Sequence, residues 1–152
     1  MVPKRLYCVD EDYASVGDPF FATIPAAFTQ LTTDGCSSSN KAGILLHPKG
    51  SSYDEDLTFN QASFYFTVKG EMRDVCNISG DIAVSNGVVI FENLRLSGDI
   101  AVTGGTAVFI NCYRNSGAFS LSNGATAIIA NCENFGKVAV TGNNNTLWIE
   151  NV

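Results

Sequence analysis

The sequence is poor in charge and in long hydrophobic runs, and each shortage excludes a class of protein. Charged residues make up 16% of the 152 residues, and 15 Asp and Glu against 9 Lys and Arg give a net charge of −6. An acidic chain without a Lys/Arg cluster argues against nucleic acid as a partner. No apolar run approaches the roughly 20 residues that span a bilayer, and no apolar segment follows the basic residues at the start. We therefore expect no membrane insertion and no signal peptide.

The cysteines and the single histidine show no pattern of a metal site or a catalytic triad. The 5 cysteines are an odd number without a CxxC pair, which is typical of reduced thiols rather than of a disulfide framework or a zinc site. His47 is the only histidine, and no Ser or Cys motif stands beside it. We expect His47 at a strand end or in a turn.

What the sequence does contain is an internal repeat. The letters SGDIAV begin at Ser79 and again at Ser97, and the related SGAFSL and FGKVAV begin at Ser116 and Phe135. Each copy continues through a turn rich in Gly or Asn into a second apolar strand that ends in asparagine. A period of 18 to 20 residues that holds two short alternating strands predicts one coil of a parallel β-solenoid.

Alternation within the repeat predicts which side chains face the core. The predicted inward columns are Ile82, Ile100, Phe119 and Val138, then Val84, Val102, Leu121 and Val140, and in the second strand Phe91, Phe109, Ile129 and Ile149. The terminal asparagines share this parity: Asn93, Asn111, Asn131 and Asn151. We expect them to stack as a ladder that satisfies a buried polar group through amide-to-amide hydrogen bonds. Cys112 and Cys132 are expected to be neighbouring apolar fillers in the next column.

The first part of the chain predicts a helix before the repeats. Thr23 suits a helix N-cap and Pro25 falls within the first turn. The apolar face of the predicted helix consists of Ile24, Ala27, Phe28 and Leu31. We expect a capping helix at 23–33 inside a β-helix domain of residues 23–152, preceded by an N-terminal arm of residues 1–22.

The letters ATIPAAF, ILLHPKGSSYDEDLTF and FTVKG carry a family resemblance. In this order they resemble the opening of pectate-lyase-like proteins, pectin methylesterases among them, over about residues 20–152. The resemblance implies an all-β fold, a single-stranded right-handed parallel β-helix with 18–20 residues per coil and a short N-terminal capping helix. The QDTL-like and DFI-like stretches of the methylesterases are missing, as are the calcium-binding and basic motifs of the lyases, so no catalytic residue is carried over. Small β-helices of this kind are also similar to spike and fibre modules of viruses and phages, which implies a location in a virion or in the host cytoplasm.

Two acidic residues occupy equivalent places in adjacent repeats. Asp81 and Asp99 are expected about 5 Å apart on the outer face, with Glu92 on the neighbouring strand. One interpretation is a calcium site or an acid/base pair. The other is a pair of solvated charges beside a turn, and the sequence favours this second interpretation. No cofactor is therefore expected, and calcium bound at these aspartates is the alternative.

A second group of polar residues follows the asparagines. These residues are Arg95, Tyr113, Arg114, Glu133 and Asn134, all in equivalent turns. A groove with Arg, Tyr and Glu side chains is able to hold a glycan, but a solvated loop rim is the more frequent outcome for such a set.

The second strand of the repeat also has an unusual outward column. The residues one step before the inward positions are Ile90, Val108, Ile128 and Trp148, where a solvated strand would carry polar side chains. An exposed apolar stripe usually marks an interface. The cover is expected to be either the N-terminal arm or further copies of the chain. A closed homotrimer would bury the stripe of each of its three copies. The trimer is favoured because the stripe runs to the last repeat, farther than an arm from the first repeat is expected to reach.

The sequence therefore predicts a non-enzymatic structural β-helix that takes part in an assembly, such as a virus particle or a surface fibre. The alternative is a carbohydrate-active enzyme of the same fold (a polysaccharide lyase, hydrolase or esterase) or a glycan-binding module. Fold alone does not choose between them.

Overall fold

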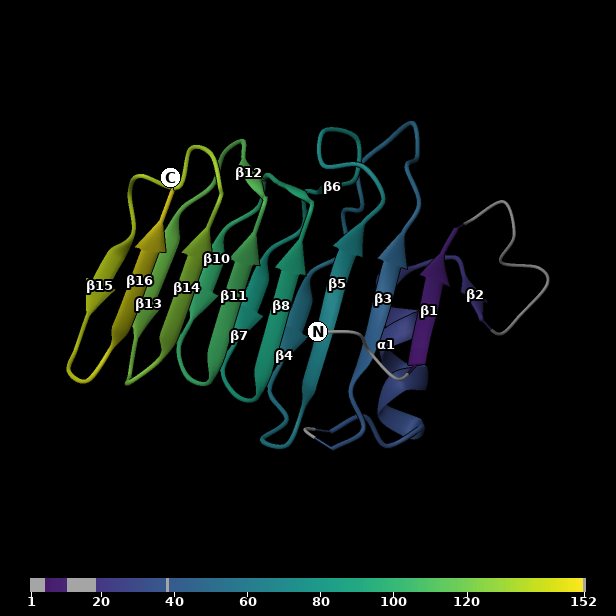
Figure 1. The fold of residues 1–152 in the computed structure, drawn as a ribbon, viewed down its shortest axis with the longest axis horizontal. Coiled ribbons are helices and arrows are strands. Elements are labelled where there is room, and N and C mark those ends of the chain that lie inside the picture. Colours follow the sequence, from purple (N-terminus) through teal and green to yellow (C-terminus); the bar gives the residue numbers. More distant parts are fainter. Residues whose placement is uncertain (1–4, 11–18, 38, 152) are drawn as a thin grey trace.

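The repeats stack into a parallel β-solenoid, and one short helix lies near the N-terminal end (Figure 1). The computed structural model describes residues 5–10, 19–37 and 39–151. Every strand pair in these ranges is parallel. The predicted all-β solenoid with an N-terminal helix is confirmed.

The strands form a large sheet and two smaller ones. In spatial order the large sheet contains β16 (Thr146–Glu150), β14 (Thr126–Ala130), β11 (Thr106–Ile110), β8 (Val88–Glu92), β5 (Tyr65–Gly70), β3 (Ala42–Leu46), β1 (Arg5–Val9) and β2 (Phe20–Phe21). The second sheet contains β15 (Ala139–Thr141), β13 (Phe119–Ser122), β10 (Ile100–Val102), β7 (Ile82–Val84) and β4 (Leu57–Phe59). The third contains β12 (Tyr113–Arg114), β9 (Arg95–Leu96) and β6 (Asn77–Ile78).

The third sheet corrects the sequence-based prediction, which treated these residues as turns. Arg95 pairs with Asn77 on one side and with Tyr113 on the other. These strands are two residues long, too short to show the alternation that reveals a strand in a sequence. A coil of this solenoid therefore has three walls rather than two.

The core fills the space between the walls with the predicted columns. Ile82, Ile100 and Phe119 are in register and at most 2% exposed. The rings of Phe91 and Phe109 stack with centroids 5.2 Å apart and an interplanar angle of 11°. The final coil differs: Val138 is half-buried, and Val140 and Ile149 are 48% exposed. No described strand stacks on that side of β15 and β16, so their inward positions remain in contact with solvent.

Glycine at one corner of the coil allows the closest backbone contact in the stack. A Cβ atom added at Gly98 would lie 2.1 Å from the carbonyl oxygen of Gly80, and one added at Gly117 would lie 2.2 Å from that of Gly98. Gly80 meets the carbonyl oxygen of Glu55 in the same way. The atoms that each added Cβ would meet belong to the backbone of the preceding coil, so no flexible side chain is able to move aside. The repeated SG letters therefore reflect the absence of room for a Cβ atom.

We expect Gly98→Ala to lower the free energy of unfolding by about 3 kcal/mol or more, because the coils would have to separate locally. Gly136→Ala is the matched control, since Gly136 lies in the same column of the final coil and nothing stands within 4 Å of its Cβ position. Chemical denaturation followed by circular dichroism measures both. Equal stability of the two variants would show that the corner has room.

Helix α1 (Ile24–Thr33) begins and ends as the sequence predicts. The side chain of Thr23 accepts a hydrogen bond from the backbone N–H of Ala26 at 3.2 Å, which makes it the N-cap. At the other end Gly35 has φ +73°, and the N–H of Cys36 donates to the carbonyl of Leu31 at 3.1 Å. This is a Schellman C-cap. Ile24, Ala27 and Leu31, the helix residues that are buried, face the core. No helix in the described ranges is long and apolar enough to cross a membrane.

The helix covers a place where the large sheet has no opposite wall. The large sheet continues past β3 to β1 and β2, whereas the second sheet ends at β4. Helix α1 contacts β1, β2 and β3. The N-terminal segment, expected as an arm, thus contributes β1 and β2 to the solenoid; Tyr13, which was expected to take part in that arm, lies outside the described residues.

Phe28 fastens this helix to the core. Its ring centroid lies 5.4 Å from that of Phe59, 5.0 Å from Phe64 and 5.5 Å from Phe66. We expect Phe28→Asp to lower the free energy of unfolding by about 3 kcal/mol or more, because a charge would enter an aromatic cluster without a partner. Thermal and denaturant unfolding provide the measurement. Ala26→Asp, on the exposed side of the same helix, is the control, and a Phe28→Asp variant as stable as that control would contradict the capping role.

Candidate functional site

Asp81 and Asp99 stand in a column of carboxylates that begins one coil earlier, at Asp56. Each aspartate directly precedes a strand of the second sheet, and all three are exposed. Asp56 Oδ1 accepts the N–H of Asp81 at 2.9 Å, and Asp81 Oδ1 accepts the N–H of Asp99 at 2.9 Å. Asp99 Oδ1 in turn accepts the N–H of Ala118 at 2.7 Å. The column therefore bridges successive coils, and one oxygen of each carboxylate is engaged in doing so.

The sequence did not indicate Asp56, because its coil lacks the SGD letters. The pairing of Leu57 with Ile82 reveals the equivalence, and only the structure supplies that register.

Glu92, the third residue of the candidate calcium site, lies elsewhere, at the end of β8 in the large sheet. There its carboxylate pairs with Lys69 Nζ at 2.7 Å. Within residues 5–10, 19–37 and 39–151, no three His, Cys, Asp or Glu side chains gather in a way that could hold a metal ion.

The candidate glycan residues divide between two columns. Arg95, Tyr113 and Glu133 are in register along the third sheet. The guanidinium of Arg95 lies 5.6 Å from the centroid of the Tyr113 ring, and its Nη2 donates to Asn115 Oδ1 at 2.7 Å. Its Nε is buried and has no hydrogen-bond partner among the residues that the structure describes. One face of the Tyr113 ring is thus occupied by Arg95.

Arg114 belongs to a different column, that of the buried Leu96. Its side chain is half-buried, and Nη1 donates to the carbonyl oxygen of Lys137 at 3.0 Å. Asn134, which the sequence grouped with these residues, donates from Nδ2 to the carbonyl of Arg114 at 2.7 Å. Arg114 therefore lies toward the corner between the third sheet and the second, away from Arg95.

Arg73, which lies between β5 and β6, was not among the residues predicted from the sequence. Arg73 Nη1 donates to Glu133 Oε1 at 2.7 Å across 60 residues of sequence. This hydrogen bond holds the pKa of Arg73 above its usual range. Because residues 71–75 have no counterpart in the later repeats, no periodic signal connects Arg73 to Glu133.

The asparagines do form part of a ladder, but they are not buried. Asn111 Nδ2 donates to Asn93 Oδ1 at 2.9 Å, and Asn151 Nδ2 donates to Asn131 Oδ1 at 3.2 Å. Asn93 is half-buried and the other three are exposed, which corrects the prediction of a buried polar column.

The backbone explains why asparagine recurs at this corner. The φ angles are +59° at Asn93, +51° at Asn111, +52° at Asn131 and +52° at Asn151. A left-handed residue turns the chain sharply from the large sheet into the third wall, and asparagine is among the few residues other than glycine that adopt this conformation readily.

Two substitutions at Asn111 separate backbone conformation from hydrogen bonding. We expect Asn111→Ala to lower the free energy of unfolding by about 1–2 kcal/mol, because alanine is strained at positive φ. Asn111→Gly loses the same amide but relieves the strain, so it should cost less than Asn111→Ala. Denaturant midpoints of both variants test this. If glycine and alanine cost the same, the amide rather than the backbone determines the residue.

Cys112 and Cys132 are stacked neighbours, as predicted. The N–H of Cys112 lies 3.3 Å from Cys132 Sγ, and both residues are at most 1% exposed. Burial raises the pKa of the Cys112 thiol well above its usual value. A buried thiol kept in this protonated state is a poor nucleophile, which agrees with a packing role.

His47 follows β3 directly and contacts an acidic residue. Its Nδ1 lies 3.0 Å from Glu71 Oε2, and its carbonyl oxygen accepts the Tyr53 hydroxyl at 2.5 Å. The position at a strand end matches the prediction. No serine or cysteine side chain has a hydrogen bond to the ring among the described contacts.

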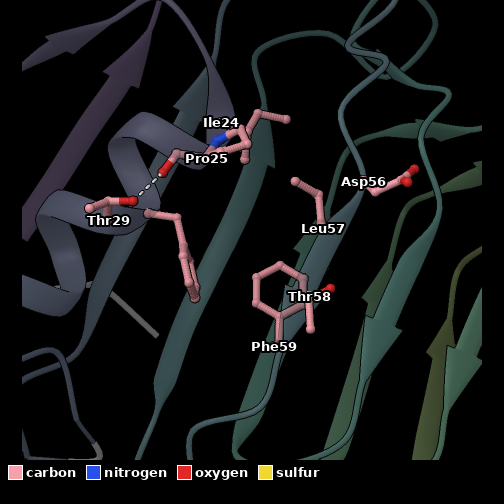
Figure 2. Close-up of a pocket in the computed structure, with 8 residues that line it drawn as sticks. Ile24, Pro25, Thr29, Asp56, Leu57, Thr58 and Phe59 are labelled. Atoms are coloured by element: carbon pink, nitrogen blue, oxygen red, sulfur yellow. Dashed lines mark hydrogen bonds between the residues drawn. The ribbon is translucent and has the colours of Figure 1, made fainter.

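A hollow of about 190 Å³ lies between helix α1 and β4 (Figure 2). Ile24, Pro25 and Thr29 line it from the helix, and the Thr29 hydroxyl is occupied by a hydrogen bond to the Pro25 carbonyl at 2.9 Å. On the strand side, the Asp56 carboxylate points away from the helix residues. The hollow is thus a mainly apolar seam between cap and coil.

A second hollow, the corner hollow, lies where the third sheet meets the second. Its volume is about 270 Å³, and it is lined by Arg114, Gly117, Ala118, Phe119, Lys137 and Ala139. It combines two cationic residues with apolar ones and has no acidic lining residue.

The apolar outward column is present as predicted, on the outer face of the large sheet. Val108 pairs with Ile90 and with Ile128, and Ile128 pairs with Trp148. The three aliphatic residues are half-buried and Trp148 is 61% exposed. We call these four residues the outer ridge.

Comparison of the chain with protein-family models, with curated proteins and with solved structures finds no match in any of the three. The assignment of a function therefore depends on the geometry of the chain itself.

Proposed function

We propose that the protein is a non-enzymatic structural component that assembles into a homotrimer through its outer ridge. The observation that carries the proposal is the unbroken apolar column from β8 to β16 on the outer face of the large sheet. The expected pattern for a solvated face is polar, and the equivalent residue of β5 is indeed polar, Thr67. The ridge begins where the regular repeats begin.

The N-terminal segment does not cover this ridge in the described residues. Strand β1 pairs with β3, and β2 pairs with β1, so both lie at the far end of the large sheet from β16 (Figure 1). The described part of that segment thus extends the sheet edge rather than crossing its outer face. This supports a separate chain as the cover.

A second copy of the chain matches the ridge for a geometric reason. The side chains of the ridge repeat at the strand spacing, about 4.8 Å, and a parallel copy presents the same spacing at the same height. The outward columns on its two sides are mixed, so the strip that is apolar in every one of these coils is narrow. One column contains Val88, Thr106, Thr126 and Thr146, and the other contains Glu92, Ile110, Ala130 and Glu150. A narrow strip from each copy suits a threefold axis parallel to the solenoid, where each chain contributes one line of side chains.

Placement of such a trimer in a virus particle or a surface fibre extends the proposal further. It rests on the resemblance of the repeats to spike and fibre modules. In such an assembly the ridge has a mechanical role, because it holds three parallel solenoids together as a stiff rod.

We expect the parent protein to have three times the 16.2 kDa chain mass at micromolar concentration, and Ile128→Glu to be monomeric, because three buried carboxylates would meet at the axis. Light scattering coupled to size-exclusion chromatography measures both. Thr141→Glu is the matched control: it adds the same charge to an exposed position of β15 in the second sheet and should leave the trimer intact.

Circular dichroism of Ile128→Glu establishes that the solenoid itself is folded. A monomeric or dimeric parent would overturn the trimer. A trimer that survives Ile128→Glu would show that a different face forms the interface.

A further inference from the structure

The corner hollow stands where the column of aspartates is interrupted. Asp56, Asp81 and Asp99 each accept the backbone N–H of the equivalent residue in the next coil. The next residue in that column is Ala118, which has no carboxylate, and the residue after it is Lys137. Ala118 and Lys137 both line the hollow.

The interruption leaves a backbone donor without the acceptor that its equivalents have. The N–H groups of Asp81, Asp99 and Ala118 all bond to a carboxylate. The N–H of Lys137 has no hydrogen-bond partner among the described residues. Nothing stands within 4 Å of the Cβ position of Gly136, so the last coil packs less closely against the coil before it at this corner, which leaves room for an acceptor from outside the chain.

The positive charges around the hollow also lack the partners that other cations have. Among the described cationic side chains, Lys69 and Arg73 pair with carboxylates, and Lys41, Lys49 and Arg95 lie over tyrosine rings. Arg114 and Lys137 have neither kind of partner, and both line the corner hollow. The single bond of the Arg114 guanidinium, to the Lys137 carbonyl, leaves its other N–H groups available.

We propose that the corner hollow binds a small organic carboxylate, which takes the place of the missing aspartate side chain. One carboxylate oxygen accepts the Lys137 N–H, as the aspartates do one, two and three coils earlier, and the charge is balanced by Arg114 and Lys137. The volume of about 270 Å³ exceeds the space of an aspartate side chain, so the ligand carries a body beyond its carboxylate. Phe119 and Ala139 offer an apolar floor to that body.

The site is separate from the proposed assembly surface. The hollow lies between the third and second sheets, whereas the outer ridge belongs to the large sheet. Failure of either proposal therefore leaves the other standing.

The probe is sodium benzoate, titrated into the full chain and followed by amide chemical shifts. We expect saturable binding in the millimolar range, with the largest downfield shift at the Lys137 amide, because that N–H gains a charged acceptor. Benzyl alcohol, which has the same ring without the charge, and inorganic phosphate, which has charge without the apolar body, are the comparison probes. Benzyl alcohol should bind at least about tenfold more weakly, the factor typical for loss of one charge-assisted hydrogen bond. Phosphate should also bind at least about tenfold more weakly, because it leaves the apolar floor of the hollow in contact with water.

Three variants locate the binding. Lys137→Gln and Arg114→Gln should each weaken benzoate binding by about tenfold, since each removes a charged donor. Ala118→Asp should abolish it, and the Lys137 amide of this variant should appear downfield before any ligand is added. Lys49→Gln, which removes a cation that lies over Tyr53 outside the hollow, is the control and should bind as the parent does.

Several results would overturn the proposal: no saturation by benzoate, equal binding of benzyl alcohol or phosphate, or unchanged binding in Lys137→Gln. If Arg114→Gln does not fold, Lys137→Gln and Ala118→Asp decide the question alone. Full benzoate binding by Ala118→Asp would also exclude the hollow as the site.

Discussion

The direct contact of one backbone with the next at the glycine corner is the constraint on which the rest of the structure depends. The carbonyl of one coil occupies the place where a side chain of the next would begin, as between Gly80 and Gly98. Adjacent coils therefore approach to the ladder distance at a corner as well as along the walls. The aspartates that follow Gly80 and Gly98 then accept the N–H of the next coil. Register in the coils from Glu55 to Gly117 follows from this, because a slip of one residue would place a Cβ atom against a carbonyl.

Because the register is fixed, equivalent residues of successive coils stack into columns, and the members of a column are mostly of one chemical type. The inward columns become a continuous core of aliphatic and aromatic side chains, and the asparagine corner turns every coil at the same height. A column has consequences that a single residue does not have. One apolar residue on a surface is common, but Ile90, Val108 and Ile128 in line form a continuous apolar stripe, and the proposed interface depends on that continuity. The same logic makes a departure informative, as Ala118 is in the aspartate column.

The repeat letters were enough to predict the solenoid, the core columns and the adjacency of Asp81 and Asp99, because alternation and a fixed period encode them directly. The helix was predictable from its own capping residues. Other features were not predictable. The third wall consists of two-residue strands, which are too short to show alternation. The asparagines fall at inward positions of the alternating pattern, yet they are not buried, because their left-handed backbone breaks that pattern. Asp56 and Arg73 lie outside the regular letters, so their places in the columns depend on a register that only the folded chain supplies.

The ion pair of Arg73 with Glu133 changes how far the coils depend on one another. In a solenoid each coil contacts only its neighbours, so stability is a sum of local terms and opening is able to start anywhere. The third wall begins beside Arg73, at Asn77. Glu133 lies three coils further along this wall, which is roughly 14 Å at the usual strand spacing. An exposed pair of this kind contributes little to overall stability. Its effect is on cooperativity: the coils between its two ends cannot separate one at a time without breaking it, so this tie lengthens the range over which the stack unfolds as one unit.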